Sequence, residues 1–190
     1  MRGPTPSCSA PTATSWRSPS GSAKAAAADE VRGWIGRAER ASAASADPAT
    51  GRRHSCDQAA GARVPAATHA GFLAFWAGLG DAALAASLER WIAGAAFAVP
   101  SVAADNPRFG RKRYWRGPAW AIANMLIAEG LREAGFADLA RRIRADARRL
   151  IEGAGFFERF DPLDGAGLGG GRFTWTAAMW LAWARAGEAA

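Results

Sequence analysis

Residues 114–120 of this 190-residue chain, YWRGPAW, combine the types of side chain that bind sugars. They include the chain's only tyrosine, Tyr114, together with Trp115, Arg116 and Trp120. Sugars present apolar C–H faces and polar rims, so aromatic rings can cover the faces while a guanidinium reaches hydroxyls or a carboxylate. The alternative is that these aromatics only fill a core. A binding role is favoured, because Arg116 beside buried aromatics would be costly without a partner.

A second segment, residues 155–162 (GFFERFDP), carries a carboxyl group between aromatic side chains. In such a wall, desolvation would disfavour the charged form of Glu158. A carboxyl group of this kind is a candidate for proton transfer. Asp161 and Asp164 are interpreted instead as turn residues, because Pro162 and Gly165 follow them directly.

The second segment continues into a glycine-rich stretch, residues 165–171. It lacks the Lys-Ser/Thr ending of a phosphate-binding loop. Glycine allows a close approach of the backbone, so we expect this stretch to let the main chain come near the pocket.

Helical periodicity indicates the elements that position both segments. Three segments are apolar on nearly every face over at least part of their length, which is typical of buried inner helices. They are residues 72–78, 118–134 and 175–186. Residues 81–93 and 136–152 have one apolar stripe each, which is typical of outer helices. Asp81 is suited to cap one helix, and Pro118 to the first turn of another. The alternation predicts an all-α fold, a partial toroid of helical hairpins.

In such a toroid, the loops at one end of the inner helices form the pocket. Both chemistry-bearing segments precede inner helices. We therefore expect the side chains of Tyr114, Trp115, Trp120 and Glu158 to converge at one end of the helices.

The N-terminal part of the chain has a different composition. Residues 1–28 are rich in Ser, Pro, Thr and Ala without a periodic pattern, which predicts a disordered or foreign segment. A short helix is expected over residues 30–44. The predicted domain therefore covers residues 29–190.

Charge and cysteine content limit the possible classes of function. The formal net charge of +7 raises the possibility of a nucleic-acid binder. However, the arginines of residues 141–149 alternate with Asp138 and Asp146, which favours a solvated helix face. Two cysteines and two histidines match no metal or disulfide framework, and no apolar run reaches about 18 residues. We expect no metal, no cofactor and no membrane span. The N-terminus has no secretory signal, so a cytoplasmic enzyme is the default.

The order of several motifs resembles the C-terminal half of glycoside hydrolase family 63, with the bacterial mannosylglycerate/glucosylglycerate hydrolase branch nearest. The resemblance covers roughly residues 30–190. Its motifs are DPATGRRHSCDQ (47–58), THAGFLAFWAGL (68–79), VPSVAADNPRF (99–109), YWRGPAW (114–120), NMLIAEGL (124–131), GFFERFDP (155–162) and FTWTAAMWLAWA (173–184).

The resemblance implies an (α/α)6 barrel that hydrolyses α-glucosidic or α-mannosidic bonds with inversion, with a small carbohydrate such as glucosylglycerate or mannosylglycerate as substrate. It implies that Glu158 is the general base, which activates a water molecule between its carboxylate and the sugar. In an inverting enzyme the general acid and the general base lie about 6.5–9.5 Å apart. The substrate-binding residues that it implies are Tyr114, Trp115, Arg116, Gly117, Trp120, Phe160 and Trp175.

The chain also departs from the family pattern. Arg159 follows the glutamate where the family often has tyrosine, and Cys56-Asp57 stands where a Tyr-Asp pair is usual. The family's general acid is an aspartate well upstream, and none of the chain's own upstream aspartates lies in a matching motif. These are Asp29, Asp47, Asp57, Asp81 and Asp105.

These departures predict a truncated or split gene product that carries the base half of the site. We expect this product to be inactive alone, and its possible partner is a separately encoded N-terminal half. The alternatives are a non-catalytic carbohydrate-binding remnant, or a toroid of the trehalase or oligosaccharide-glucosidase type. An arginine-rich nucleic-acid binder is the least favoured hypothesis, and no nucleic-acid partner is expected.

Overall fold

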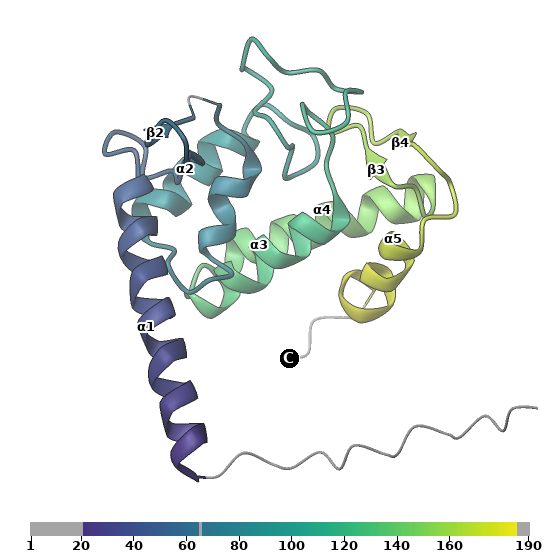
Figure 1. Ribbon diagram of the computed structural model, residues 1–190. Coiled ribbons are helices and arrows are strands. Elements are labelled where there is room, and N and C mark those ends of the chain that lie inside the picture. Colours follow the sequence, from purple (N-terminus) through teal and green to yellow (C-terminus); the bar gives the residue numbers. More distant parts are fainter. Residues whose placement is uncertain (1–20, 65, 186–190) are drawn as a thin grey trace, which may run out of the picture. The chain divides into compact units, whose positions relative to one another are not determined.

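The computed structural model describes residues 21–64 and 66–185, and most of its elements are helices (Figure 1). The predicted all-α class is thereby confirmed. The chain divides into two compact units, Met1–Ala38 and Glu39–Ala190. In chain order the elements are α1 (Gly21–Ser45), β1 (Cys56–Asp57), β2 (Ala62–Arg63), η1 (His69–Ala74), α2 (Ala82–Ile92), α3 (Ala121–Glu133), α4 (Ala137–Ala154), β3 (Arg159–Phe160), β4 (Gly167–Leu168), α5 (Thr174–Met179) and η2 (Trp180–Ala184).

Helix α1 begins at Gly21, nine residues before the predicted start at Glu30, and it ends at Ser45. Residues 21–28, for which the composition predicted disorder or foreign sequence, are therefore helical. Residues 1–20 of that predicted segment lie outside the described residues. None of the described helices is both long and apolar enough to cross a membrane.

Helix α3 lies at the centre of the second unit. It packs against η1 and α5, which are the other two predicted inner segments, and against the outer helix α4 (Figure 1). Gly130 of α3 lies close to the chain just after η1, because a Cβ atom there would overlap the backbone of Phe75 and Trp76. The largest fully buried apolar side chains of the core are Phe72, Phe75, Leu84, Leu88, Ile92, Val99, Ile127, Leu131, Ile143 and Phe160.

Helix α4 is the outer helix that the sequence predicted, with one exception on its charged face. Its apolar stripe is buried, and ion pairs such as Arg148–Glu152 lie along the other side. Asp146, however, is buried rather than solvated. Its Oδ2 accepts a hydrogen bond from the Ala98 amide at 2.9 Å, and Arg149 donates to its Oδ1. The interpretation of this face as wholly solvated was therefore wrong at Asp146.

A second buried polar contact ties the chain before the site to α3. The Asn124 side chain accepts from the Val99 amide at 3.1 Å and donates to the Ala98 carbonyl at 2.6 Å. Buried backbone polar groups need partners, so Asn124 and Asp146 together hold residues 98–99 in place.

The ends of the inner segments differ from those predicted. The first is a 3-10 helix over His69–Ala74 followed by turns, instead of an α-helix over 72–78. Pro118 is not in the first turn of α3, because the helix starts at Ala121 with Trp120 as its N-cap. The third changes from α-helix to a π-helical turn at Trp180. Asp81 caps α2 as predicted, since its carboxylate accepts from the Leu84 amide at 2.8 Å.

Candidate active site

Main-chain hydrogen bonds bring the two chemistry-bearing segments together. Ala119 and Phe160 form an isolated antiparallel bridge, in which Ala119 N–H donates to the Phe160 carbonyl at 2.8 Å and Phe160 N–H donates back at 2.9 Å. Ala119 also bridges to Pro100 on its other side. Because Trp120 and Glu158 lie within two residues of this bridge, their segments run side by side at the start of α3.

Arg111, just before the first segment, is joined by its side chain to the second segment and to the turn that follows it. Its guanidinium pairs with the fully buried Asp161 and with Asp164. The Leu163 amide donates to Asp161, and the Ala166 amide donates to Asp164. Both aspartates therefore are turn residues, as predicted, and Arg111 adds an ion-pair link that the sequence pattern did not indicate.

The side chains of Tyr114, Trp115, Trp120 and Glu158 converge, as expected. Tyr114 Oη donates to Glu158 Oε1 at 2.9 Å. The Trp115 and Trp120 rings are stacked with centroids 4.0 Å apart, and the Tyr114 ring meets each of them edge-on. Arg159 completes the group, because its guanidinium donates to Glu158 Oε2. We call these five residues the Glu158 cluster.

The cluster has an exposed layer and a buried layer. The Tyr114 and Trp115 side chains are each 48% exposed, whereas Trp120 is only 3% exposed. Trp120 Nε1 donates to the Tyr114 carbonyl at 3.2 Å. Tyr114 and Trp115 can therefore meet a sugar face directly, and Trp120 supports them from behind.

The surroundings of Glu158 differ from the purely aromatic wall that the sequence suggested. Both of its carboxylate oxygens accept hydrogen bonds, one from a hydroxyl and one from a guanidinium. The contact also affects its partner. The pKa of Tyr114 is raised, chiefly by the hydrogen bond to Glu158 and then by burial and by the negative charge of Glu158, while the charge of Arg159 acts in the opposite direction.

Four other predicted site residues are not part of this contact network. Arg116 is exposed, and among the described residues its side chain donates to the Arg108 carbonyl alone, so the argument that it needs a buried partner does not apply. Gly117 packs closely against the backbone at Gly110, because a Cβ at position 117 would lie 2.6 Å from the Gly110 carbonyl oxygen. Phe160 is a core residue, 1% exposed. Trp175 is 60% exposed and packs edge-on against Phe173.

The glycine-rich stretch approaches the cluster at Gly169. Its φ is +81°, and a Cβ atom there would overlap Glu158 Oε2 and crowd Arg159. The Gly170 carbonyl also accepts a hydrogen bond from the Glu158 amide at 3.2 Å. These contacts agree with the expectation that the stretch brings backbone close to the pocket.

Gly169→Ala is expected to reduce the free energy of unfolding by about 1–2 kcal/mol, because alanine is strained at positive φ, and to displace the Glu158 carboxylate. Gly170→Ala is the matched control, since a Cβ at Gly170 meets nothing within 4 Å. Urea denaturation of both variants measures the difference. Equal stability of the two variants would contradict the close approach at Gly169.

His69 is a neighbour of the cluster that the sequence analysis did not single out. Its ring stacks on Trp115 at 5.8 Å, it is 7% exposed, and its Nδ1 has no hydrogen-bond partner among the described residues. Burial lowers its pKa, although a hydrogen bond to Ser101 partly opposes the shift. No local pattern could have identified His69, because its partner lies far along the chain.

His69 makes stability depend on pH. Its folded pKa lies below the unfolded value of 6.5, so the unfolded chain binds the proton more readily. The stabilisation is therefore complete above about pH 6.5 and falls as the pH drops through the folded pKa. Denaturant midpoints measured from about pH 8 down to about pH 5 should decline more steeply for the wild type than for His69→Gln. Parallel curves would contradict this.

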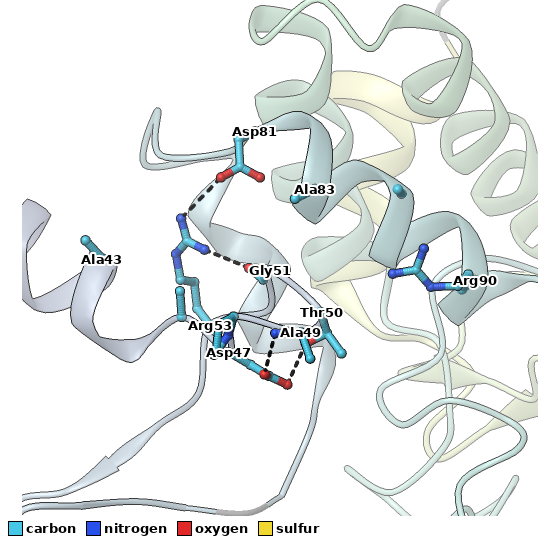
Figure 2. A pocket seen from close by; sticks show the side chains of 12 residues that line it. Ala43, Asp47, Ala49, Thr50, Gly51, Arg53, Asp81, Ala83 and Arg90 are labelled. Carbon is cyan, nitrogen blue, oxygen red and sulfur yellow. Dashed lines mark hydrogen bonds and ion pairs between the residues drawn. The ribbon is translucent and has the colours of Figure 1, made fainter.

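A separate hollow of about 480 Å³ lies between the turn at residues 46–51 and helix α2 (Figure 2). Its polar groups bond to one another. The Asp47 carboxylate accepts from Thr50 Oγ1 and the Ala49 amide, which lowers its pKa, and Arg53 bonds to the Gly51 and Leu79 carbonyls. These contacts hold the turn together and join Arg53 to the chain just before α2, so the polar groups of the hollow have a structural explanation.

The packing of α3 against η1, α4 and α5 is that of helical hairpins in an α/α toroid. A family model described as "Mannosylglycerate hydrolase MGH1-like glycoside hydrolase domain" matches residues 20–176. The chain belongs to this family, and the resemblance seen in its motifs is confirmed.

Individual relatives agree with this assignment. The chain is 46% identical over 131 residues to mannosylglycerate hydrolase MGH1 of Selaginella moellendorffii, covering 67% of this chain and 27% of that protein. It is 47% identical over 135 residues to mannosylglycerate hydrolase of Thermus thermophilus, covering 69% and 32%.

Among solved structures, the crystal structure of a GH63 mannosylglycerate hydrolase from Thermus thermophilus in complex with Tris and D-glycerate superposes with a TM-score of 0.76 at 43% identity. The match covers 80% of this chain and 38% of that one. The fold is therefore part of an (α/α)6 toroid, as predicted. The chain spans about a third of the length of the curated relatives it matches.

Proposed function

We propose that this chain carries the general-base half of an inverting glycoside hydrolase site, with Glu158 as the base. The substrate would be a small α-glucoside or α-mannoside such as mannosylglycerate or glucosylglycerate. Glu158 would draw a proton from a water molecule as the water attacks the anomeric carbon. Tyr114 and Trp115 would cover the apolar face of the sugar.

The observation that carries this proposal is the contact of Glu158 with the exposed Tyr114. It sets a carboxylate at the edge of a partly exposed aromatic surface. The family membership and the relatives' names support this choice of substrate class. Each carboxylate oxygen keeps a lone pair beyond the one bond it accepts, so a water can still reach Glu158.

Inversion also needs a general acid on the other side of the scissile bond. Within the described residues, Glu158 is the only carboxylate that takes part in the hydrogen bonds and ion pairs of the cluster. We propose that the acid is supplied by a part of the toroid outside this chain. A cytoplasmic location and a domain over residues 29–190 stay predictions.

The second candidate is a carbohydrate-binding remnant without catalysis. The partly exposed Tyr114–Trp115 surface favours it equally, since binding needs no general acid. A trehalase-like specificity is the remaining alternative and concerns only the choice of substrate.

The test is hydrolysis of mannosylglycerate, glucosylglycerate and trehalose by the chain alone and by the chain joined to the upstream part of the toroid. We expect no useful turnover by the chain alone and turnover by the completed protein. Robust turnover by the chain alone would overturn the missing-acid proposal. Sugar binding without turnover by the completed protein would favour the remnant.

A further inference from the structure

Arg159 follows the candidate base Glu158 directly in the sequence. Arg159 turns back over the Glu158 cluster. Its Nη1 donates to Glu158 Oε2, and its guanidinium carbon lies 4.6 Å from the Tyr114 ring centroid and 6.0 Å from that of Trp120. The Arg159 guanidinium thus contacts the Glu158 carboxylate and also lies over the ring of Tyr114, which donates a hydrogen bond to the same carboxylate.

The placement of Arg159 is unfavourable unless its contacts compensate. Its side chain is 15% exposed, and its Nε is buried without a hydrogen-bond partner among the described residues. An unpaired buried donor reduces stability. A charge-assisted hydrogen bond and the aromatic ring beneath it can offset that loss.

The backbone restricts both residues of the pair. Arg159 pairs with Leu168 in the β3–β4 ladder, and the Glu158 amide donates to the Gly170 carbonyl. Between them, Gly169 leaves room for the pair, because a Cβ there would overlap Glu158 Oε2 and lie 2.9 Å from Arg159 Nη1. The glycine loop therefore fits this ion pair closely.

We propose that Arg159 is a positioning residue, which holds the Glu158 carboxylate against the Tyr114 hydroxyl at the edge of the sugar-binding surface. Its catalytic meaning rests on the proposed function of Glu158, whereas the positioning itself does not. Arg159 acts through Glu158, whose carboxylate it contacts.

Tyr114 reports on this positioning. The hydrogen bond to Glu158 is the main cause that raises the pKa of Tyr114, and the charge of Arg159 works weakly against it. If Arg159 supplied only its charge, Arg159→Gln would raise this pKa further. If Arg159 holds Glu158 in place, the same substitution releases the carboxylate and the pKa falls. The direction of the shift therefore separates the two roles.

The experiment is an absorbance titration of tyrosinate in the full chain, which reports Tyr114 alone because the chain has one tyrosine. The variants are Arg159→Gln, Glu158→Gln and the double variant. Arg113→Gln is the matched control, since Arg113 is exposed, adjacent to Tyr114 and not ion-paired among the described residues. We expect Arg159→Gln to lower the pKa of Tyr114 when Glu158 is present and not to lower it in the Glu158→Gln background.

A rise in the pKa with Arg159→Gln, or no more change than with Arg113→Gln, would overturn the proposal. If a variant unfolds at alkaline pH, the ¹³Cζ resonance of labelled tyrosine at neutral pH replaces the titration. Arg159→Gln should then shift this resonance in the same direction as Glu158→Gln, and an unchanged resonance would reject the assignment. No substrate is involved, so a failed hydrolysis assay leaves this test unaffected.

Discussion

Replacing Glu158 by glutamine in the completed toroid is expected to lower kcat by about 10²–10⁴-fold, the usual contribution of a general base. Glutamine keeps the size of the side chain and can still accept the hydrogen bond that Tyr114 donates. It cannot accept a proton from the attacking water. Because that proton moves only in the transition state, KM should change little.

Glu152→Gln is the matched control for this variant. Glu152 is an exposed glutamate of α4 that pairs with Arg148 on the outer face. Its substitution should leave kcat close to that of the wild type. Steady-state kinetics on mannosylglycerate measures both variants. Full turnover by Glu158→Gln would show that another residue is the base and would refute the proposed function.

Gly130→Ala is expected to lower the free energy of unfolding by about 3 kcal/mol, at the upper end of the usual overpacking range. Gly130 lies at the contact of α3 with the chain after η1, where a Cβ would overlap the backbone of Phe75 and Trp76. A backbone segment cannot rotate away as a side chain can, so the two inner segments must separate. Such a loss is a large fraction of the stability of a typical domain.

Gly153→Ala provides the control within α4. A Cβ at Gly153 meets nothing within 4 Å. Alanine should therefore stabilise this helix by about 0.5–1 kcal/mol through its better helix propensity. Denaturant midpoints of the two variants give opposite shifts if the packing at Gly130 is correct. A stabilised Gly130→Ala variant would contradict the close approach.

The helices themselves could be predicted because their signals are local. Periodic apolar residues located α2, α3 and α4 to within a few residues, and the apolar stripe of α4 is buried as its spacing requires. The ends were less well predicted. Pro118 precedes α3 because residues 119 and 160 form a bridge there, and this long-range contact leaves no trace in the local pattern.

The sequence by itself indicated four of the five residues of the Glu158 cluster, since Tyr114, Trp115, Trp120 and Glu158 occur in two short segments of unusual composition. Only the tertiary structure decided their surroundings. It buried Trp120, exposed Arg116 and placed Phe160 in the core, because exposure depends on what packs against a side chain from elsewhere in the chain.

The same physical reason explains the residues that the sequence did not indicate. Arg159 contacts Glu158 where the pairing of β3 with β4 brings Gly169 beside them, and His69, the first residue of η1, stacks on Trp115 from a distant part of the chain. Asp146 likewise lies in the charged pattern of α4, but it is buried and accepts a hydrogen bond from the Ala98 amide. Residue type and spacing specify helices and candidate chemistry in order along the chain, whereas contacts between distant segments arise only when the helices pack.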